Sequence, residues 1–320
     1  MRVGLYFDVR NPPPWRKPWV DLYAQTLDWI GGAEQAGADS IWLTEHHFFE
    51  DGYLPQPLTF AAAVASSTQR VRIGTAVVLA PLQPALRIAE DAALVDLISG
   101  GRLELGLGAG YVRPEFDAFD ADRKRRFETL ALRFEEIRRL HAEGRVTPPP
   151  AQDPIPLWGG YLGPKGAQQA GKLDVGLLTL ERKNVELYLG AHAAAGHPAT
   201  SARCAGVQNI ILADDPEKAF EELLPHYAYQ TNSYRAALYA GSGKSPRTAT
   251  ADDVRAGLDG RHSGAFQVLS VDEAAEQIGE RCAGLPVEDV FLWASIAGMP
   301  DTLVERHIEL TSGPLRDALV

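Results

Sequence analysis

Short apolar runs alternate with longer amphipathic stretches along the whole chain. The first pair is clear: Val3–Phe7 is mostly apolar, and Val20–Ala36 carries apolar residues at helical spacing up to Gly37. A period near 3.6 predicts a helix, and a following glycine is a typical helix stop. The pattern predicts seven further strands, at Ser40–Thr44, Val71–Leu79, Arg102–Leu107, Ile155–Trp158, Val175–Leu180, Val207–Leu212 and Asp289–Trp293. It predicts eight further helices, at Leu58–Ser67, Leu86–Ile98, Arg126–Glu143, Gly166–Lys172, Val185–Ala195, Pro216–Leu224, Val271–Arg281 and Thr302–Thr311.

This alternation indicates the fold class. Strands that alternate with helices form parallel βαβ units, and eight such units in 320 residues favour a closed barrel over an open sheet. We therefore predict an α/β protein with a single (β/α)8 TIM barrel over residues 1–320. Residues near 231–265 are rich in Gly, Ser, Thr and Asp and have no clear period. We predict that they form an irregular insertion before the last unit.

Charge and cysteine content narrow the expected setting. The formal net charge of −11 argues against nonspecific binding to nucleic acid or to anionic membranes. No apolar stretch approaches the roughly 18 residues of a membrane helix, and the N-terminus has no signal-peptide pattern. Cys204 and Cys282 form neither a disulfide framework nor a zinc pattern. We expect a cytoplasmic protein that uses no metal, nucleic acid or membrane.

The segment after the second strand carries the main candidate chemistry. Glu45, His46 and His47 are followed there by Phe48 and Phe49. Active sites of such barrels form at the C-terminal ends of the strands. A neutral histidine suits proton transfer, and aromatic rings suit a flat ligand. Because adjacent residues of an extended chain point to opposite sides, only one histidine is expected to face the ligand. The alternative is a strand end that satisfies its own hydrogen bonds.

Small residues follow the next two strands. Gly74–Ala76 either lets a planar ring lie against the backbone or fills a packing layer of the barrel. Gly106, Gly108 and Gly110 alternate, but their spacing departs from that of a dinucleotide fingerprint. These glycines are expected to open space for a ligand at the barrel mouth.

Two features could bind a phosphate group. Gly159, Gly160 and Gly163 lie between the fifth strand and a helix, where free backbone N–H groups can hold a phosphate. An ordinary tight turn is the alternative. The basic run Arg123–Arg126 is either a solvated helix start or a phosphate contact.

Three stretches together resemble a known family. They are TEHHF after the second strand, the run RVRIGTAVVLAPLQPALRIAEDAALVDLISGGRLELGLGAGYVRPEFDAF, and the W-G-G turn. The chain resembles the luciferase-like flavin-dependent oxidoreductases, strongly over residues 1–180 and mainly in layout afterwards. The resemblance implies reduced flavin mononucleotide (FMN) at the C-terminal mouth of the barrel. It also implies the contact residues, which are His46, Ala76 and Val77 at the flavin ring and Gly159, Gly160 and Gly163 at the phosphate.

The chain departs from this family at one position. In bacterial luciferase an arginine after the fourth strand also holds the phosphate, and this chain has Ala109 there. A second family arginine begins the following helix, where Arg126 matches best and Arg123 is the alternative. Because of Ala109, either the phosphate is held by other residues or the cofactor is not FMN.

The resemblance implies a monooxygenase that uses reduced FMN and oxygen, through a peroxyflavin, on a small organic substrate. A separate flavin reductase would supply the reduced FMN, because the chain has no NAD(P)H fingerprint. In this reading His46 handles a proton, Glu45 and His47 orient His46, and Tyr111 and Phe48 shape the substrate pocket. One alternative is hydride transfer with the deazaflavin F420. Another is a noncatalytic flavin-binding protein.

Family members often form dimers through helices on one side of the barrel. A homodimer is therefore expected here, and Leu58–Ser67 and Leu86–Ile98 are the candidate interface helices. Core packing would explain the same apolar residues.

Overall fold

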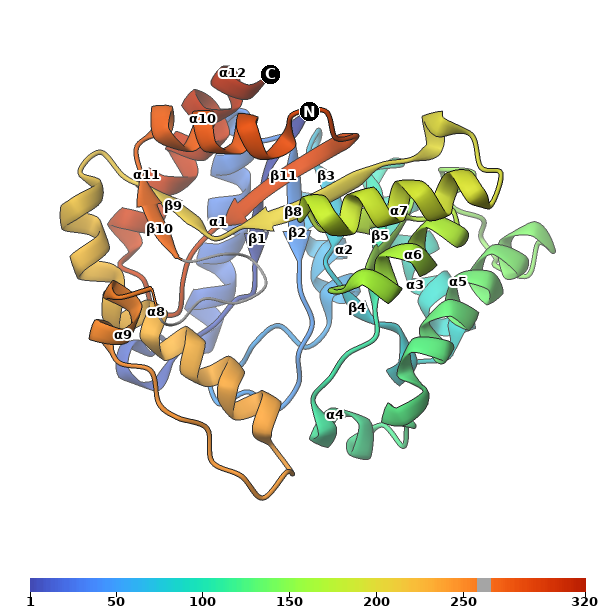
Figure 1. The fold of residues 1–320 in the computed structure, drawn as a ribbon, viewed down its shortest axis with the longest axis horizontal. Coiled ribbons are helices and arrows are strands. Elements are labelled where there is room, and N and C mark those ends of the chain that lie inside the picture. Colours follow the sequence, from blue (N-terminus) through green and yellow to red (C-terminus); the bar gives the residue numbers. More distant parts are fainter. Residues whose placement is uncertain (258–265) are drawn as a thin grey trace.

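Eight parallel strands close into a barrel in the computed structural model, which describes residues 1–257 and 266–320. Neighbours in the ring follow chain order, and the pairings of β1 with β11 and of β3 with β5 complete it. The barrel strands are β1 (Arg2–Phe7), β2 (Ser40–Leu43), β3 (Arg72–Thr75), β5 (Leu103–Gly108), β6 (Leu157–Gly160), β7 (Gly176–Leu178), β8 (Cys204–Gln208) and β11 (Val287–Trp293). The predicted TIM barrel is confirmed (Figure 1).

Helices surround the strands (Figure 1). The longer ones are α1 (Trp19–Ala36), α2 (Pro57–Ser67), α3 (Ala85–Ser99), α5 (Arg126–Ala142), α6 (Pro164–Lys172), α7 (Arg182–Ala194), α8 (Pro216–Tyr239), α10 (Val271–Cys282) and α11 (Asp301–Leu310). Short helices are α4 (Arg113–Ala118), α9 (Ala251–Arg255) and α12 (Arg316–Leu319). Gly37 ends α1 with φ 112°, and Gly100 ends α3 with φ 68°. Both glycines adopt the left-handed conformation that favours glycine at a helix end.

The predicted strand Val71–Leu79 is interrupted in the structure. It divides into β3 and β4 (Val78–Leu79), with Ala76 and Val77 between them. The Thr75 hydroxyl donates to Gly106 O at 2.8 Å and accepts from Gly106 N at 2.9 Å. A side chain thus takes a position in the ladder between β3 and β5, and the backbone after Thr75 leaves the sheet.

The last third of the chain corrects two further predictions. The run Val207–Leu212 divides into β8 and β9 (Ile210–Leu212), and β9 leaves the barrel to pair with β10 (Gln267–Leu269). The segment near 231–265 is not irregular at its start, because α8 continues through Tyr239 and α9 follows. Residues 258–265 lie outside the described residues.

The barrel interior is filled by side chains, as expected for this fold. Trp42 stacks on Phe291 at 4.8 Å between ring centroids and meets Trp158 edge-on at 5.9 Å. A Cβ atom at Gly74 would lie 2.2 Å from the Trp42 ring. The small residue of the third strand therefore makes room for a core tryptophan and not for a ligand. Ligand space is left at the C-terminal end of the strands.

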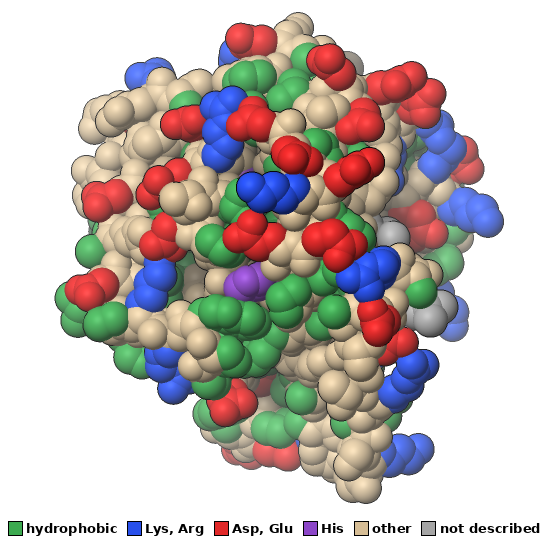
Figure 2. Space-filling view, turned by 90° about the vertical axis from the view of Figure 1, so that its left-hand side faces the viewer, with side chains coloured by type: hydrophobic (Ala, Val, Ile, Leu, Met, Phe, Trp, Pro, Cys, Tyr) green, Lys and Arg blue, Asp and Glu red, His purple; other side chains and the backbone are tan. Residues whose placement is uncertain are grey.

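Acidic and basic side chains are interspersed on the face shown in Figure 2, with apolar side chains between them. Among the described helices, none is long and apolar enough to cross a membrane.

Candidate active site

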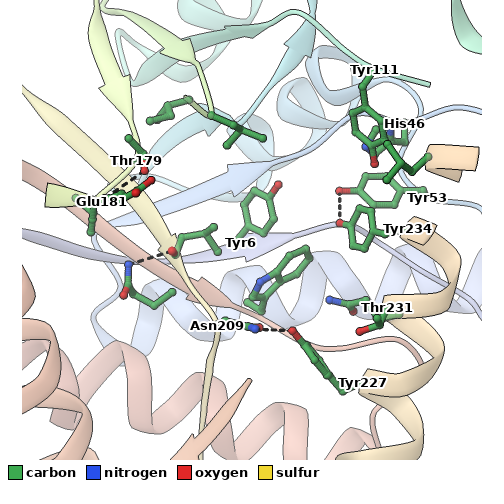
Figure 3. Close-up of a pocket in the computed structure, with 18 of the residues that line it drawn as sticks. Tyr6, His46, Tyr53, Tyr111, Thr179, Glu181, Asn209, Tyr227, Thr231 and Tyr234 are labelled. Carbon is green, nitrogen blue, oxygen red and sulfur yellow. Dashed lines mark hydrogen bonds between the residues drawn. The ribbon is translucent and has the colours of Figure 1, made fainter. Parts of the chain in front are cut away.

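A cavity of about 800 Å³ opens at the C-terminal ends of the strands. Half of the chain's ten tyrosines line it, so its walls suit a flat ligand. Its residues belong to β1, β7, β8 and β11, to the segments that follow β2 and β5 to β8, and to α7, α8 and α10 (Figure 3). They are Tyr6, His46, Tyr53, Tyr111, Leu162, Leu178, Thr179, Leu180, Glu181, Arg182, Val207, Gln208, Asn209, Tyr227, Gln230, Thr231, Tyr234, Leu238, Arg281 and Trp293.

His46 is the predicted catalytic residue that reaches this cavity. Its Nδ1 lies 2.8 Å from Oε1 of Glu115, a fully buried residue of α4. The same oxygen accepts the backbone N–H of His47 at 2.9 Å. Phe49 stacks on the His46 ring at 4.8 Å, and Tyr53 and Tyr111 meet that ring edge-on. Because Nδ1 is engaged by Glu115, Nε2 is the ring nitrogen left for a ligand.

Glu45 and His47 lie on the other side of the chain, away from the His46 ring. His47 Nε2 is 3.0 Å from Glu45 Oε1, and Glu45 Oε2 accepts the backbone N–H of Leu79 at 2.8 Å. Neither Glu45 nor His47 is among the described residues that line the cavity. The two side chains connect β2 to β4, and Glu115 occupies the orienting position that we expected Glu45 and His47 to hold.

Ala76 and Val77 form the link between β3 and β4, joined by a cis peptide bond. The Tyr6 hydroxyl donates to Ala76 O at 2.9 Å, and Tyr6 lines the cavity. Ala76 packs against the Trp42 and Trp158 cluster and is not itself among the described residues that line the cavity, so its contact with a flavin ring stays a prediction.

Val77 explains two of the predicted glycines. A Cβ atom at Gly108 would lie 2.2 Å from Val77 Cγ2, and one at Gly160 would lie 2.5 Å from Val77 Cγ1. The absence of a side chain at both glycines leaves the space that the Val77 side chain occupies. The open space that we expected at Gly108 is filled from within the protein.

The turn between β6 and α6 holds the remaining predicted glycines. Gly163 is the residue before α6, and Gly159 and Gly166 lie so close to Tyr161 that an added Cβ atom would come within 2.9 and 2.7 Å of its ring. The Tyr161 hydroxyl is buried and has no hydrogen-bond partner among the described residues. Leu162, the next residue, lines the cavity.

Arg123 and Arg126 lie close together at the start of α5. Arg126 Nη1 donates to Arg123 O at 2.9 Å, and Arg123 donates weakly to Tyr111 O at 3.5 Å. Burial and the charge of Arg123 lower the pKa of Arg126. Within the described part of the chain, neither arginine forms an ion pair, and Arg126 Nε is buried without a partner. Ala109 is buried nearby in sequence and offers no charge.

A buried charged cluster, which the sequence reasoning missed, lies beneath the cavity. Arg10 donates to Asp8 at 2.7 Å, to Asp51 at 2.5 Å and to Ser233 of α8 at 2.9 Å. Burial raises the pKa of Asp8 to about 6, against the opposing effect of Arg10. Asp8 and Arg10 directly follow β1, so the strand-end rule that found His46 would also have found them.

The comparisons with known proteins agree with the barrel fold. The family model described as "Luciferase-like monooxygenase" matches residues 1–289. The chain belongs to the luciferase-like monooxygenase family. One structural relative is described in complex with FMN, and one curated relative is named as F420-dependent.

Three relatives of this luciferase-like chain illustrate the range of the family. The oxygenase component of flavin-dependent trigonelline monooxygenase of Acinetobacter baylyi is 32% identical over 133 residues, 39% of this chain and 37% of that protein. An F420-dependent glucose-6-phosphate dehydrogenase of Amycolatopsis mediterranei is 32% identical over 178 residues, 49% of this chain and 53% of that one. The crystal structure of monooxygenase RslO1 from Streptomyces bottropensis superimposes with a TM-score of 0.79 at 25% identity, covering 98% of both chains. The matches span a quarter to about half of the curated relatives' lengths.

Of the other predicted positions in this luciferase-like barrel, Tyr111 lines the cavity but Phe48 does not. Phe48 is 69% exposed and lies beside His47. No group of three or more potential metal ligands occurs within residues 1–257 and 266–320. No local sequence pattern pointed to Glu115 or Tyr53 as site residues. They contact His46 from a short helix and from a loop, and neither segment carries a strand-end motif.

Proposed function

We propose that this luciferase-like oxidoreductase is an FMN-dependent monooxygenase that acts on a small organic substrate. The observation that carries the proposal is the pairing of His46 with buried Glu115 at the wall of an aromatic cavity. The cavity adjoins Ala76, whose carbonyl is held by Tyr6. A proton-handling group therefore lies beside a surface that suits a flat ring.

The residues present fit a phosphate-bearing flavin. Arg126 Nε and the Tyr161 hydroxyl are buried polar groups without partners among the described residues, and each is chemically able to donate to a phosphate oxygen. Arg123 adds a second positive charge that lacks a carboxylate partner in the described chain. We propose that Arg126, Arg123 and the turn at Gly159, Gly160 and Gly163 hold the phosphate. Ala76 and Val77 would support the ring.

The protein's own contribution to the reaction is orientation and proton handling. Bound reduced FMN would supply the electrons that let molecular oxygen transfer one atom to the substrate and release the other as water. Because a carboxylate only accepts hydrogen bonds, His46 donates Nδ1–H to Glu115 and keeps a lone pair on Nε2. Nε2 can then take up a proton at the cavity wall, and Glu115 stabilises the resulting positive charge. The surrounding rings exclude water.

Two partners belong to the proposal. A separate flavin reductase supplies reduced FMN, as the words "oxygenase component" in the name of the trigonelline relative suggest for that protein. A second copy of this chain packs against α3, whose outer face exposes Leu94, Leu97 and Ile98. Exposed apolar stripes of this kind favour an interface between proteins.

F420-dependent hydride transfer is the second candidate. Ala109 removes one arginine that holds the FMN phosphate in bacterial luciferase, and a relative of 32% identity is named an F420-dependent dehydrogenase. In that case no oxygen would be consumed.

The deciding experiment is anaerobic titration of the protein with reduced FMN and with reduced F420, followed by air. We expect tighter binding of FMN and a rate of reoxidation that differs from that of free FMN. Arg126→Ala should weaken FMN binding about tenfold, the loss of one charge-assisted contact, and leave riboflavin, which lacks the phosphate, unchanged. Tight F420 binding without oxygen consumption would instead favour the second candidate.

A further inference from the structure

Two tyrosine hydroxyls meet at the His46 end of the cavity. The hydroxyl oxygens of Tyr53 and Tyr234 are 3.1 Å apart, and both residues line the cavity (Figure 3). Tyr53 comes from the loop after β2 and Tyr234 comes from α8. Residues far apart in the sequence therefore form one pair of hydrogen-bonding hydroxyls. Edge-on contacts place both rings against His46, at 4.9 and 6.2 Å between centroids.

The buried charges beneath hold this hydroxyl pair in place. The Arg10 guanidinium lies 4.5 Å from the ring centroid of Tyr53 and 4.5 Å from that of Tyr234. Its positive charge is paired with Asp8 and Asp51, both fully buried, so it is not available to a ligand. The two rings therefore pack on an arginine whose charge is compensated by two buried carboxylates.

The two hydroxyls stay neutral. Burial raises the pKa of Tyr53 and of Tyr234 well above the ordinary tyrosine value. When one hydroxyl donates to the other, the pair retains one O–H that it can donate and lone pairs that can accept. The pair thus offers a ligand hydrogen bonds without charge.

We propose that Tyr53 and Tyr234 form a binding subsite for an oxygen atom of a flat, uncharged substrate, either a carbonyl or a hydroxyl oxygen. The inference rests on the proposed function and extends it to the substrate class. The aromatic walls accept the flat skeleton, and the hydroxyl pair fixes its oxygen beside His46, where the proton would be handled.

Charge and desolvation separate this substrate class from two others. A carboxylate would lose its hydration at the hydroxyl pair, where the adjacent Arg10 is already paired with Asp8 and Asp51. A pure hydrocarbon would form no hydrogen bond with the pair. A neutral oxygen avoids both costs.

The test measures binding of three size-matched probes to the flavin-free protein. We expect 2-acetonaphthone to bind about tenfold more tightly than 2-ethylnaphthalene, the effect of about one hydrogen bond, and 2-naphthoate to bind most weakly. Equal binding of the ketone and the hydrocarbon, or tightest binding of the carboxylate, would overturn the proposal. Absence of ketone binding would overturn it as well.

The variant Tyr53→Phe with Tyr234→Phe removes the hydroxyls and keeps the rings. It should bind the ketone as weakly as the hydrocarbon, while hydrocarbon binding stays unchanged. Tyr23→Phe is the matched control, because Tyr23 packs on Phe60 and is not among the described cavity residues. An unchanged preference for the ketone in the double variant would overturn the proposal.

A titration of the double variant with reduced FMN tests the assignment to the substrate. We expect FMN binding to change less than threefold. A loss of FMN binding as large as the loss of ketone binding would assign the hydroxyls to the cofactor instead. If the wild-type protein binds the ketone selectively but binds neither FMN nor F420, the proposed function is wrong. The proposal that Tyr53 and Tyr234 bind a neutral oxygen atom would still hold.

Discussion

His46 and Glu115 show what a single buried contact adds to a motif. The strand-end rule identified His46, because its segment follows β2 and barrels place their chemistry there. It could not identify Glu115, which is 69 residues further along and reaches the ring from α4. No periodicity in the sequence encodes that contact, since it depends on how the chain after β5 folds over the barrel mouth.

Glu115→Gln should lower turnover about 10- to 100-fold, because the imidazole loses the carboxylate that stabilises its positive charge. The dissociation constant for FMN should change little, since Glu115 is not among the described residues lining the cavity. Steady-state kinetics with a substrate found by screening, together with anaerobic FMN titration, check this. Asp117→Asn on the exposed side of α4 is the control. Unchanged turnover in Glu115→Gln would remove the proposed role.

Asp8 predicts a specific pH dependence of stability. Its folded pKa of about 6 lies above the usual aspartate value, so the folded state binds the proton more tightly than the unfolded state. This contribution is present at low pH and is lost as the pH rises through 6. Relative to Asp8→Asn, the wild type should therefore gain about 1.4 kcal/mol of unfolding free energy between pH 8 and pH 5. Urea unfolding at both pH values measures it, and parallel profiles would contradict it.

At the scale of elements, the periodicity of apolar residues predicted which segments form helices or strands better than it predicted which elements pair with one another. The run Val207–Leu212 was predicted as one strand, although the polar pair Gln208 and Asn209 interrupts it, and the structure changes sheets at that pair, between β8 and β9. The C-terminal half of α8 was missed because polar and small residues hide its period, while its packing over the cavity supplies the missing stabilisation. Tertiary contacts decide such segments where local pattern is weak.

The packing of Val77 against β5 and β6 gives a prediction at this scale. Gly108→Ala places a methyl group about where Val77 Cγ2 lies, so it should destabilise the fold by about 1–3 kcal/mol through overpacking. Val77→Ala removes the clashing group, and the double variant should recover most of that loss. Urea unfolding of the four proteins forms a double-mutant cycle. Strictly additive effects would show that the two residues are not coupled.

At the scale of the whole molecule, the barrel leaves one helix with an unpartnered apolar stripe. Leu94, Leu97 and Ile98 of α3 are 48%, 40% and 52% exposed, although the opposite side of α3 packs on α2 and α5. A two-fold dimer would bury this stripe against its own copy, because the same patch then serves both subunits.

Leu94→Glu combined with Ile98→Glu should convert this dimer to a monomer, since each subunit would bring two carboxylates to the shared interface. Sedimentation velocity at micromolar concentration measures the change, and circular dichroism confirms that the fold is kept. Val20→Glu is the matched control, because Val20 is 81% exposed at the start of α1, outside the stripe. A monomeric wild type, or a variant that stays dimeric, would show that α3 is not the interface. Retention of FMN binding in the monomeric variant would further show that each barrel carries a complete site.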